Sequence, residues 1–152
     1  MATRSTISIK ENGKIRTIYC HWDGYPSNNG ATLLEHYTTT EKVNELINLG
    51  DISSLRENVA PNENDGILRV WSSEKKDYDV ITTKEPHSFD KPYADVVVAY
   101  HRDRGEELNI RECKFQKDIQ GEEYDYLFKD GKWSYRAYNG KWKPLTQKVC
   151  EN

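Results

Sequence analysis

The sequence lacks the features that would direct it into or across a membrane. It contains no apolar run of membrane-spanning length, and no apolar stretch of the kind found in signal peptides follows Met1. It also lacks a disulfide pattern, because Cys20, Cys113 and Cys150 are odd in number and show no Cys-x-x-Cys spacing. We therefore expect reduced thiols, a cytoplasmic location and no membrane partner.

An excess of charge of either sign is also missing. The 152 residues carry a net charge of −3, and the sequence pI is about 5.8. Lys, Arg, Asp and Glu make up 31% of the chain and are mixed along it, so no basic stripe is available to neutralise nucleic-acid phosphates. This pattern disfavours nucleic acid as a partner.

Apolar residues are few, at 36% of the chain, and the mean hydropathy is −0.93. Ten Tyr, four Trp and three Phe offset this shortage, because aromatic rings bury large areas while Tyr and Trp keep a polar tip. We expect a thin core rich in aromatic rings. A chain of this length fits one domain over residues 1–152 better than two smaller ones.

Turn signals and apolar positions predict an α+β fold. Strands at 6–9 and 15–22 flank an Asn-Gly turn. Two helices follow, one at 31–37 and one after Thr38, where Thr38 and Glu41 match a capping box. We expect an antiparallel or mixed sheet of about seven or eight strands with these two helices near the N-terminus. Further strands are predicted at 67–71, 78–82, 94–100, 110–115, 124–128, 133–138 and 142–149.

The segment 94–100 is the strongest strand prediction. Val96, Val97 and Val98 are contiguous and β-branched, which is typical of a central strand buried on both faces. The charged residues at 101–107 are expected to form a loop where this strand ends.

The first cluster of chemically able side chains is Cys-His-Trp-Asp-Gly-Tyr at 20–25. His21 and Asp23 alternate with Trp22, so we expect His21 and Asp23 on one face of a strand and Trp22 on the other. A histidine beside a carboxylate can hold a ligand or move a proton, and Trp22 or Tyr25 can stack on a base. The alternative is a structural role in which Trp22 fills the core and His21 bonds to backbone.

The second cluster is a loop bracketed by Pro86 and Pro92. It can present His87 and Asp90 to a ligand, with Phe89 as a stacking wall. The alternative is that its polar side chains form local turns and Phe89 covers an edge of the core.

The third cluster directly follows 94–100. Arg102 and Arg104, two residues apart and next to His101, can bind a phosphate or carboxylate. Asp103 and Glu106 would limit non-specific anion binding. The alternative is a solvated loop with weak ion pairs.

Enzyme signatures are absent: the sequence has no Gly-x-Ser-x-Gly, no phosphate-binding loop and no His-Glu-x-x-His. His21, His87 and His101 could assemble a metal site with nearby aspartates, but no spacing requires one. We therefore expect a binding protein without metal, cofactor or catalytic residue.

Several motifs resemble a family of small proteins encoded by bacteriophages and prophages. The match covers most of the chain, and its most specific part begins with Cys-His-Trp-Asp-Gly-Tyr. The resemblance implies a setting in the bacterial host cytoplasm, where small accessory phage proteins often blunt host defence. The matching segments are 2–7, 18–26, 33–37, 87–90, 102–106, 126–128 and 131–133.

This setting leads to three hypotheses. The first is a protein, in some cases a homo-oligomer, that sequesters a host immune nucleotide signal of the cyclic nucleotide or ADP-ribose type, with Arg102 and Arg104 on phosphate and Trp22 or Phe89 on the base. The second is an enzyme that degrades such a signal, with His21 or His101 as general acid or base. The third is an inhibitor that binds a host defence protein through exposed Tyr and Trp side chains.

Overall fold

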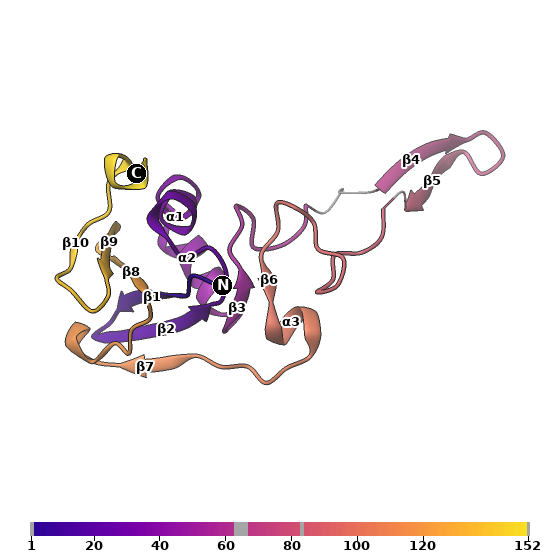
Figure 1. Ribbon diagram of the computed structural model, residues 1–152. Helices are drawn as coiled ribbons and strands as arrows, with labels where there is room; N and C mark the ends of the chain where they lie inside the picture. The colour runs from indigo at the N-terminus through magenta and orange to yellow at the C-terminus, as the bar shows by residue number, and fades with distance from the viewer. Residues whose placement is uncertain (1, 63–66, 83, 152) are drawn as a thin grey trace.

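The computed structural model describes residues 2–62, 67–82 and 84–151. These residues form an α+β fold that combines a mixed eight-stranded sheet with a few short helices (Figure 1), so the predicted fold class is confirmed. The strands run in the order β10-β9-β8-β1-β2-β3-β6, and β7 also pairs with β2. Their bounds are β1 (Ser5–Glu11), β2 (Lys14–Cys20), β3 (Ile52–Ser54), β6 (Val98–Ala99), β7 (Arg111–Cys113), β8 (Tyr124–Lys129), β9 (Lys132–Ala137) and β10 (Lys143–Pro144).

Strand β1 lies at the centre of the sheet, antiparallel to β2 and parallel to β8. The turn from β1 to β2 has positive φ at Asn12 (51°) and Gly13 (74°), a conformation that an Asn-Gly pair adopts at low cost. Asp130 and Gly131 form the matching turn between β8 and β9, with φ of 53° and 76°. The hairpin expected at the Asn-Gly turn is confirmed, and the strands predicted at 124–128 and 133–138 pair antiparallel in the same way.

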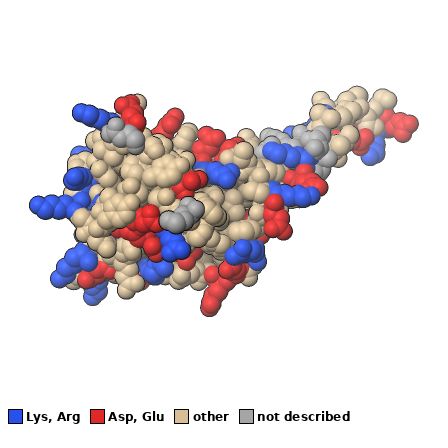
Figure 2. All heavy atoms as spheres, in the orientation of Figure 1, with Lys and Arg blue, Asp and Glu red and all other residues tan. Residues whose placement is uncertain are grey.

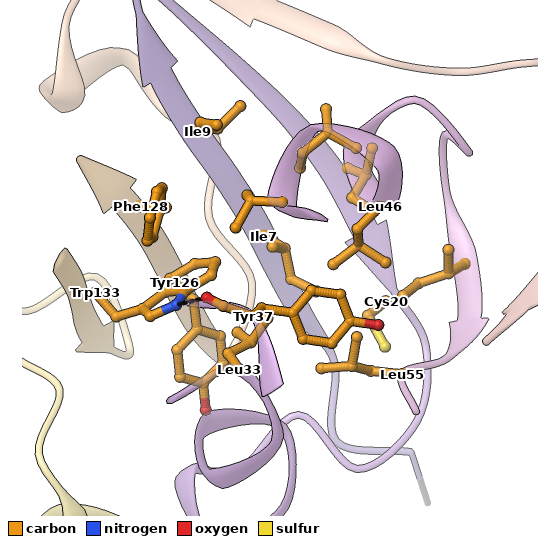
Figure 3. Close-up of a cluster of buried hydrophobic side chains, with 14 of the residues drawn as sticks. Ile7, Ile9, Cys20, Leu33, Tyr37, Leu46, Leu55, Tyr126, Phe128 and Trp133 are labelled. Carbon is orange, nitrogen blue, oxygen red and sulfur yellow. Dashed lines mark hydrogen bonds between the residues drawn. The ribbon is translucent and has the colours of Figure 1, made fainter. Parts of the chain in front are cut away.

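The main core lies between one face of this sheet and the helices α1 (Ala31–His36) and α2 (Thr40–Ile47). The two-residue alternation of β1 sends Ile7 and Ile9 to this face, and Ile7 is flanked by Ile18 of β2 and Tyr126 of β8. Figure 3 shows aromatic rings from both layers in the cluster, and Trp133 Nε1 donates a hydrogen bond to the Tyr37 carbonyl at 2.8 Å. The core thus includes buried aromatic rings, but most of its buried side chains are aliphatic.

The opposite face of the sheet carries a buried polar network. Asp125 accepts hydrogen bonds from Thr6 Oγ1 at 2.7 Å and from Arg136 Nε at 2.8 Å. Arg136 also donates to the Ile119 carbonyl at 2.9 Å. A Cβ at Gly121 would clash with Asp125 Oδ2, so the segment that crosses this face needs a glycine there.

Helix α2 begins one residue later than predicted. Its N-cap is Thr39, whose extended backbone lets the side-chain oxygen accept from Lys42 N at 3.2 Å. The predicted cap, Thr38, is exposed outside the helix. Gly50 follows the helix with a φ of 76°, a left-handed conformation in which glycine is favoured.

The prediction of a long central strand at 94–100 is wrong. Only Val98–Ala99 forms a strand, β6, and it lies at the end of the sheet beside β3. The Val97 carbonyl accepts from the side chains of Arg102 (2.6 Å) and His87 (3.1 Å), so side chains replace the neighbouring strand that the prediction required. The expected loop at 101–107 instead begins as helix α3 (Tyr100–Arg104), which Gly105 ends with a φ of 73°.

Two other segments differ in extent from their predictions. The strand expected at 110–115 shortens to β7, and a 3₁₀ turn, η2 (Gln116–Asp118), follows it. The strand expected at 142–149 is reduced to β10 and is followed by helix α4 (Gln147–Cys150).

The strands predicted at 67–71 and 78–82 are confirmed as β4 (Ile67–Ser72) and β5 (Asp77–Thr82). They pair with each other as a separate two-stranded sheet, and this hairpin projects from the rest of the fold (Figure 1). Figure 2 shows acidic and basic side chains interspersed over the visible face. In the described part of the chain, no helix has the length and apolar character needed to cross a membrane.

Candidate functional site

An open hollow of about 760 Å³ lies between β2, the start of β3 and helix α3. Its volume falls in the range of about 300–1,000 Å³ that small-ligand sites occupy. The residues that line it come from three separate parts of the sequence and include aromatic, cationic, acidic and amide side chains. They are Tyr19, Asp51, Tyr100, Arg104, Glu106, Glu107, Leu108 and Asn109.

Two tyrosines form walls of this hollow. Tyr19 is paired with Thr6 across the sheet, so its ring lies on the face opposite the main core. Its hydroxyl is 2.7 Å from His21 Nδ1. Burial raises the pKa of the Tyr19 phenol, and burial also raises the pKa of Tyr100. Both phenols are therefore protonated at neutral pH, able to form hydrogen bonds but unsuited to act as a base.

Arg104 lies against a pair of aromatic rings beside the hollow. Its guanidinium carbon is 4.2 Å from the centre of the Phe89 ring and 5.0 Å from that of Tyr100. The two rings are 5.7 Å apart. Arg104 also forms an ion pair with Glu106, so the guanidinium is held in place by stacking and by charge. The predicted residues Phe89 and Arg104, from different clusters, meet here.

Asp51 connects two other residues that line the hollow. Its carboxylate accepts from the Tyr19 backbone N–H at 2.9 Å and from Asn109 Nδ2 at 2.8 Å. Arg111 Nη2 lies 3.4 Å from Asp51 Oδ1. Leu108 packs on Gly50, where a Cβ would come within 2.8 Å of Leu108 Cδ1. The 106–109 segment is thus attached to the start of β3.

The first predicted cluster is divided between two hollows. His21 reaches the larger one only through Tyr19, and its ring packs edge-on to Trp22 at 4.7 Å. Trp22 and Asp23 instead line a separate hollow of about 250 Å³, which is small for a ligand site. The expectation that His21 and Asp23 share a face opposite Trp22 is wrong, because β2 ends at Cys20 and Asp23 turns the chain with a φ of 55°.

The other residues of this cluster, and Asn29 shortly after it, have structural roles. Buried Asn29 donates to Ser5 Oγ at 3.2 Å. A Cβ at Gly24 would lie 2.7 Å from Ser5 Cβ. Tyr25 is 39% exposed and precedes the π-helical turn η1 (Pro26–Gly30). Burial raises the pKa of the Cys20 thiol to about 11, which disfavours the thiolate that a nucleophile needs.

The second and third clusters meet through a buried contact. His87 Nε2 is 3.4 Å from Asp103 Oδ2, and His87 Nδ1 accepts from the Tyr93 N–H at 3.0 Å. Arg102 bonds to Asp103 at 2.8 Å and to the carbonyls of Val59 and Val97 at 2.5 and 2.6 Å. His87 therefore attaches the 84–93 loop to α3, while Arg102 attaches α3 to the backbone at Val59 and Val97. The two arginines do not form the expected phosphate fork.

Asp90 and His101 are two further predicted residues that line neither hollow. Asp90 is exposed in the loop before Tyr93. His101 is exposed on α3, and its Nδ1 lies 2.7 Å from the Glu106 carbonyl. Of the ten predicted ligand residues, only Arg104 lines the larger hollow directly, while His21 and Phe89 contact side chains that do.

Among the lining residues that were not predicted from the sequence are Tyr19, Asp51, Tyr100 and Asn109. Tyr19 precedes His21 by two positions on a predicted strand, and this spacing places both on one face. Asp51 had no such signal, because β3 was not predicted. Within the described residues, no group of three or more His, Cys, Asp or Glu side chains is arranged to hold a metal ion.

Comparisons with known proteins do not identify the chain. No protein-family model matches it, and neither a curated protein nor a solved structure does. The geometry of the hollow is thus the basis for a functional proposal.

Proposed function

We propose that the protein binds a small nucleotide in the hollow between Tyr19 and Tyr100 and holds it intact. One observation carries this proposal: two tyrosine rings, a stacked guanidinium and an anchored amide surround a single hollow of about 760 Å³. Flat aromatic surfaces suit a base, a guanidinium suits a phosphate, and amide or carboxylate oxygens suit ribose hydroxyls.

The charge around the hollow limits the ligand. Arg104 is the basic lining residue, whereas Asp51, Glu106 and Glu107 are acidic. A phosphate must displace Glu106 from Arg104 in order to bind. This balance favours a ligand with one phosphodiester, such as a cyclic mononucleotide, over a polyphosphate, because each further phosphate would add repulsion.

Sequestration fits these groups better than cleavage. The Tyr19 phenol, whose pKa burial raises, is a poor general base. His21 Nδ1 is occupied by the Tyr19 hydroxyl. In the setting implied by the resemblance to phage proteins, the protein would remove a host immune nucleotide signal from the bacterial cytoplasm.

A thermal-shift series tests the proposal. Purified protein is heated with 3′,5′-cyclic AMP, cyclic di-AMP, cyclic di-GMP and ADP-ribose, and nucleotide released by denaturation is analysed by chromatography. Binding to the folded state alone adds about 2.7 kcal/mol at a concentration 100 times Kd, so a hit raises the melting temperature and returns the ligand intact. Cleaved ligand would support an enzyme, and no shift with any nucleotide would contradict the proposal.

Arg104→Gln is the informative variant. It removes a charged hydrogen bond, and this loss is expected to weaken binding by about tenfold or more. Lys129→Gln makes the same change of charge at the exposed end of β8 and is expected to leave binding unchanged. Equal weakening by both variants would indicate a general charge effect instead of a site at Arg104.

A further inference from the structure

The β4–β5 hairpin exposes apolar side chains that nothing in the described chain covers. Its strands pair only with each other, and Figure 2 shows a mostly uncharged surface on this projection. A two-stranded hairpin alone is marginally stable in water, and a third strand is normally needed. Six apolar side chains are between 43% and 62% exposed: Leu68, Val70, Trp71, Tyr78, Val80 and Ile81.

The two edges of the hairpin differ in charge. Strand β5 carries Asp77 and Asp79, and Asp79 is paired with Lys75 of the turn at 2.7 Å. Strand β4 carries Arg69 as its one charged residue. Charged side chains on an edge strand discourage pairing with another chain, so β5 is protected while β4 is open to a further strand.

We infer that two copies of this chain pair antiparallel through the free edges of β4. Pairing between identical edges gives a closed dimer, whereas pairing β4 with β5 of another copy would continue into an open assembly. A pair of β5 edges would also bring the aspartates of two copies together. The β4 pairing extends each hairpin into a four-stranded sheet, which satisfies the requirement for further strands.

Of the registers centred on Arg69 and on Val70, the sequence of β4 favours the one centred on Val70. In a two-fold antiparallel pair, a residue lies opposite itself at the centre, and opposite residues share a face. A centre at Arg69 would oppose two positive charges. A centre at Val70 sets Val70 against its own copy and each Arg69 against Trp71 of the other chain, which forms two cation–π contacts. The Trp71 ring is already oriented by Tyr78, at a centroid distance of 5.3 Å.

Oligomeric state tests this inference, which does not depend on nucleotide binding. The wild-type protein is expected to behave as a dimer by light scattering at about 100 µM. Val70→Lys places two positive charges at the centre and is expected to give a monomer. Val80→Lys makes the same change at an exposed site on β5 and is expected to leave a dimer. A monomeric wild type, or equal disruption by both variants, would overturn the inference.

Disulfide trapping tests the register. Opposite Cα atoms in an antiparallel pair are about 4.5–5.5 Å apart, within reach of a disulfide. Val70→Cys is therefore expected to form a cross-linked dimer on mild oxidation, while Val80→Cys and the wild type are not. Absence of the Val70→Cys cross-link in a protein that is dimeric would overturn the proposed register. Far-UV circular dichroism of each variant checks that the fold is retained.

Discussion

Arg104 has three partners at its place beside the hollow: the rings of Phe89 and Tyr100, and the carboxylate of Glu106. The stacking orients the guanidinium, while the ion pair competes with any anionic ligand. Affinity for a phosphate therefore depends on how easily Glu106 gives up Arg104. If Arg104 binds phosphate, removing the charge of Glu106 strengthens ligand binding. If Arg104 is purely structural, it does not.

Glu106→Gln is expected to increase affinity for 3′,5′-cyclic AMP about three- to tenfold, because Arg104 loses its charged competitor. Affinity for adenosine, which has no phosphate, is expected to stay the same. Isothermal titration calorimetry measures both. Glu107→Gln is the matched control, and an equal gain in that variant would show that overall negative charge, and not the Arg104 pair, limits binding.

Gly121 is a second residue whose role is specific. A Cβ there would clash with the buried Asp125–Arg136 pair, so Gly121→Ala is expected to lower the free energy of unfolding by about 1–3 kcal/mol. Gln120→Ala, at the exposed neighbouring position, is expected to change it by less than about 0.5 kcal/mol. Urea denaturation measures both variants. Equal stability of the two would mean that the covering segment can move away from the pair.

Among the elements, helix α2 shows how local signals locate a helix but not its first residue. Thr39→Ala is expected to cost about 1 kcal/mol, because Thr39 caps the helix by accepting from Lys42 N. Thr38→Ala is expected to cost little. Urea denaturation of the two variants distinguishes them, and the reverse order of stabilities would place the cap at Thr38.

The elements that could be predicted are those with local causes. Asn12-Gly13 and Asp130-Gly131 dictate tight turns by their backbone preferences, and the apolar spacing of α2 dictates its buried face. Strand β3 has no such cause: it is three residues long and depends on pairing with Cys20 of β2 and Ala99 of β6. The run of valines at 96–98 misled for a related reason: only Val98 lies in a strand, and the Val97 carbonyl accepts from the side chains of Arg102 and His87.

In the candidate site, too, only the features with a local cause could be predicted from the sequence. Residue chemistry identified Arg104, Phe89 and His21 as notable, and each lies in or next to the larger hollow. It could not show that Arg102 bonds to the Val59 and Val97 carbonyls. Nor could it place Asp51 under Tyr19, because that contact depends on the register of β2 with β3.

At the scale of the whole molecule, Asp103 joins the 84–93 loop, helix α3 and β6. Burial alone would raise its pKa, but hydrogen bonds from Arg102 and from the Ala99 N–H lower the pKa below its ordinary value of 3.8. A carboxyl whose pKa is lowered by folding stabilises the fold above its unfolded pKa. That contribution is lost as the pH falls through the folded pKa.

Asp103→Asn is therefore expected to be less stable than the wild type at pH 7, by about 1–3 kcal/mol. The difference between the two proteins is expected to shrink as the pH falls from about 5 to about 2. Urea denaturation at a series of pH values measures it. A difference that stays constant over this range would show that Asp103 contributes through shape and not through charge.

The parallel pairing of β1 with β8 has a consequence for biosynthesis. Ser5 lies opposite Tyr124, so β1 reaches its second neighbour only after the ribosome has translated most of the chain. Until then, a nascent polypeptide holds the β1–β2 hairpin with one edge unpaired and Ile7 and Ile9 without the rings of Tyr126 and Phe128. Contacts this distant in sequence slow folding, and the sheet closes only late in translation. A chain whose translation stops before β8 emerges from the ribosome would expose the unpaired edge of β1 to chaperones and proteases.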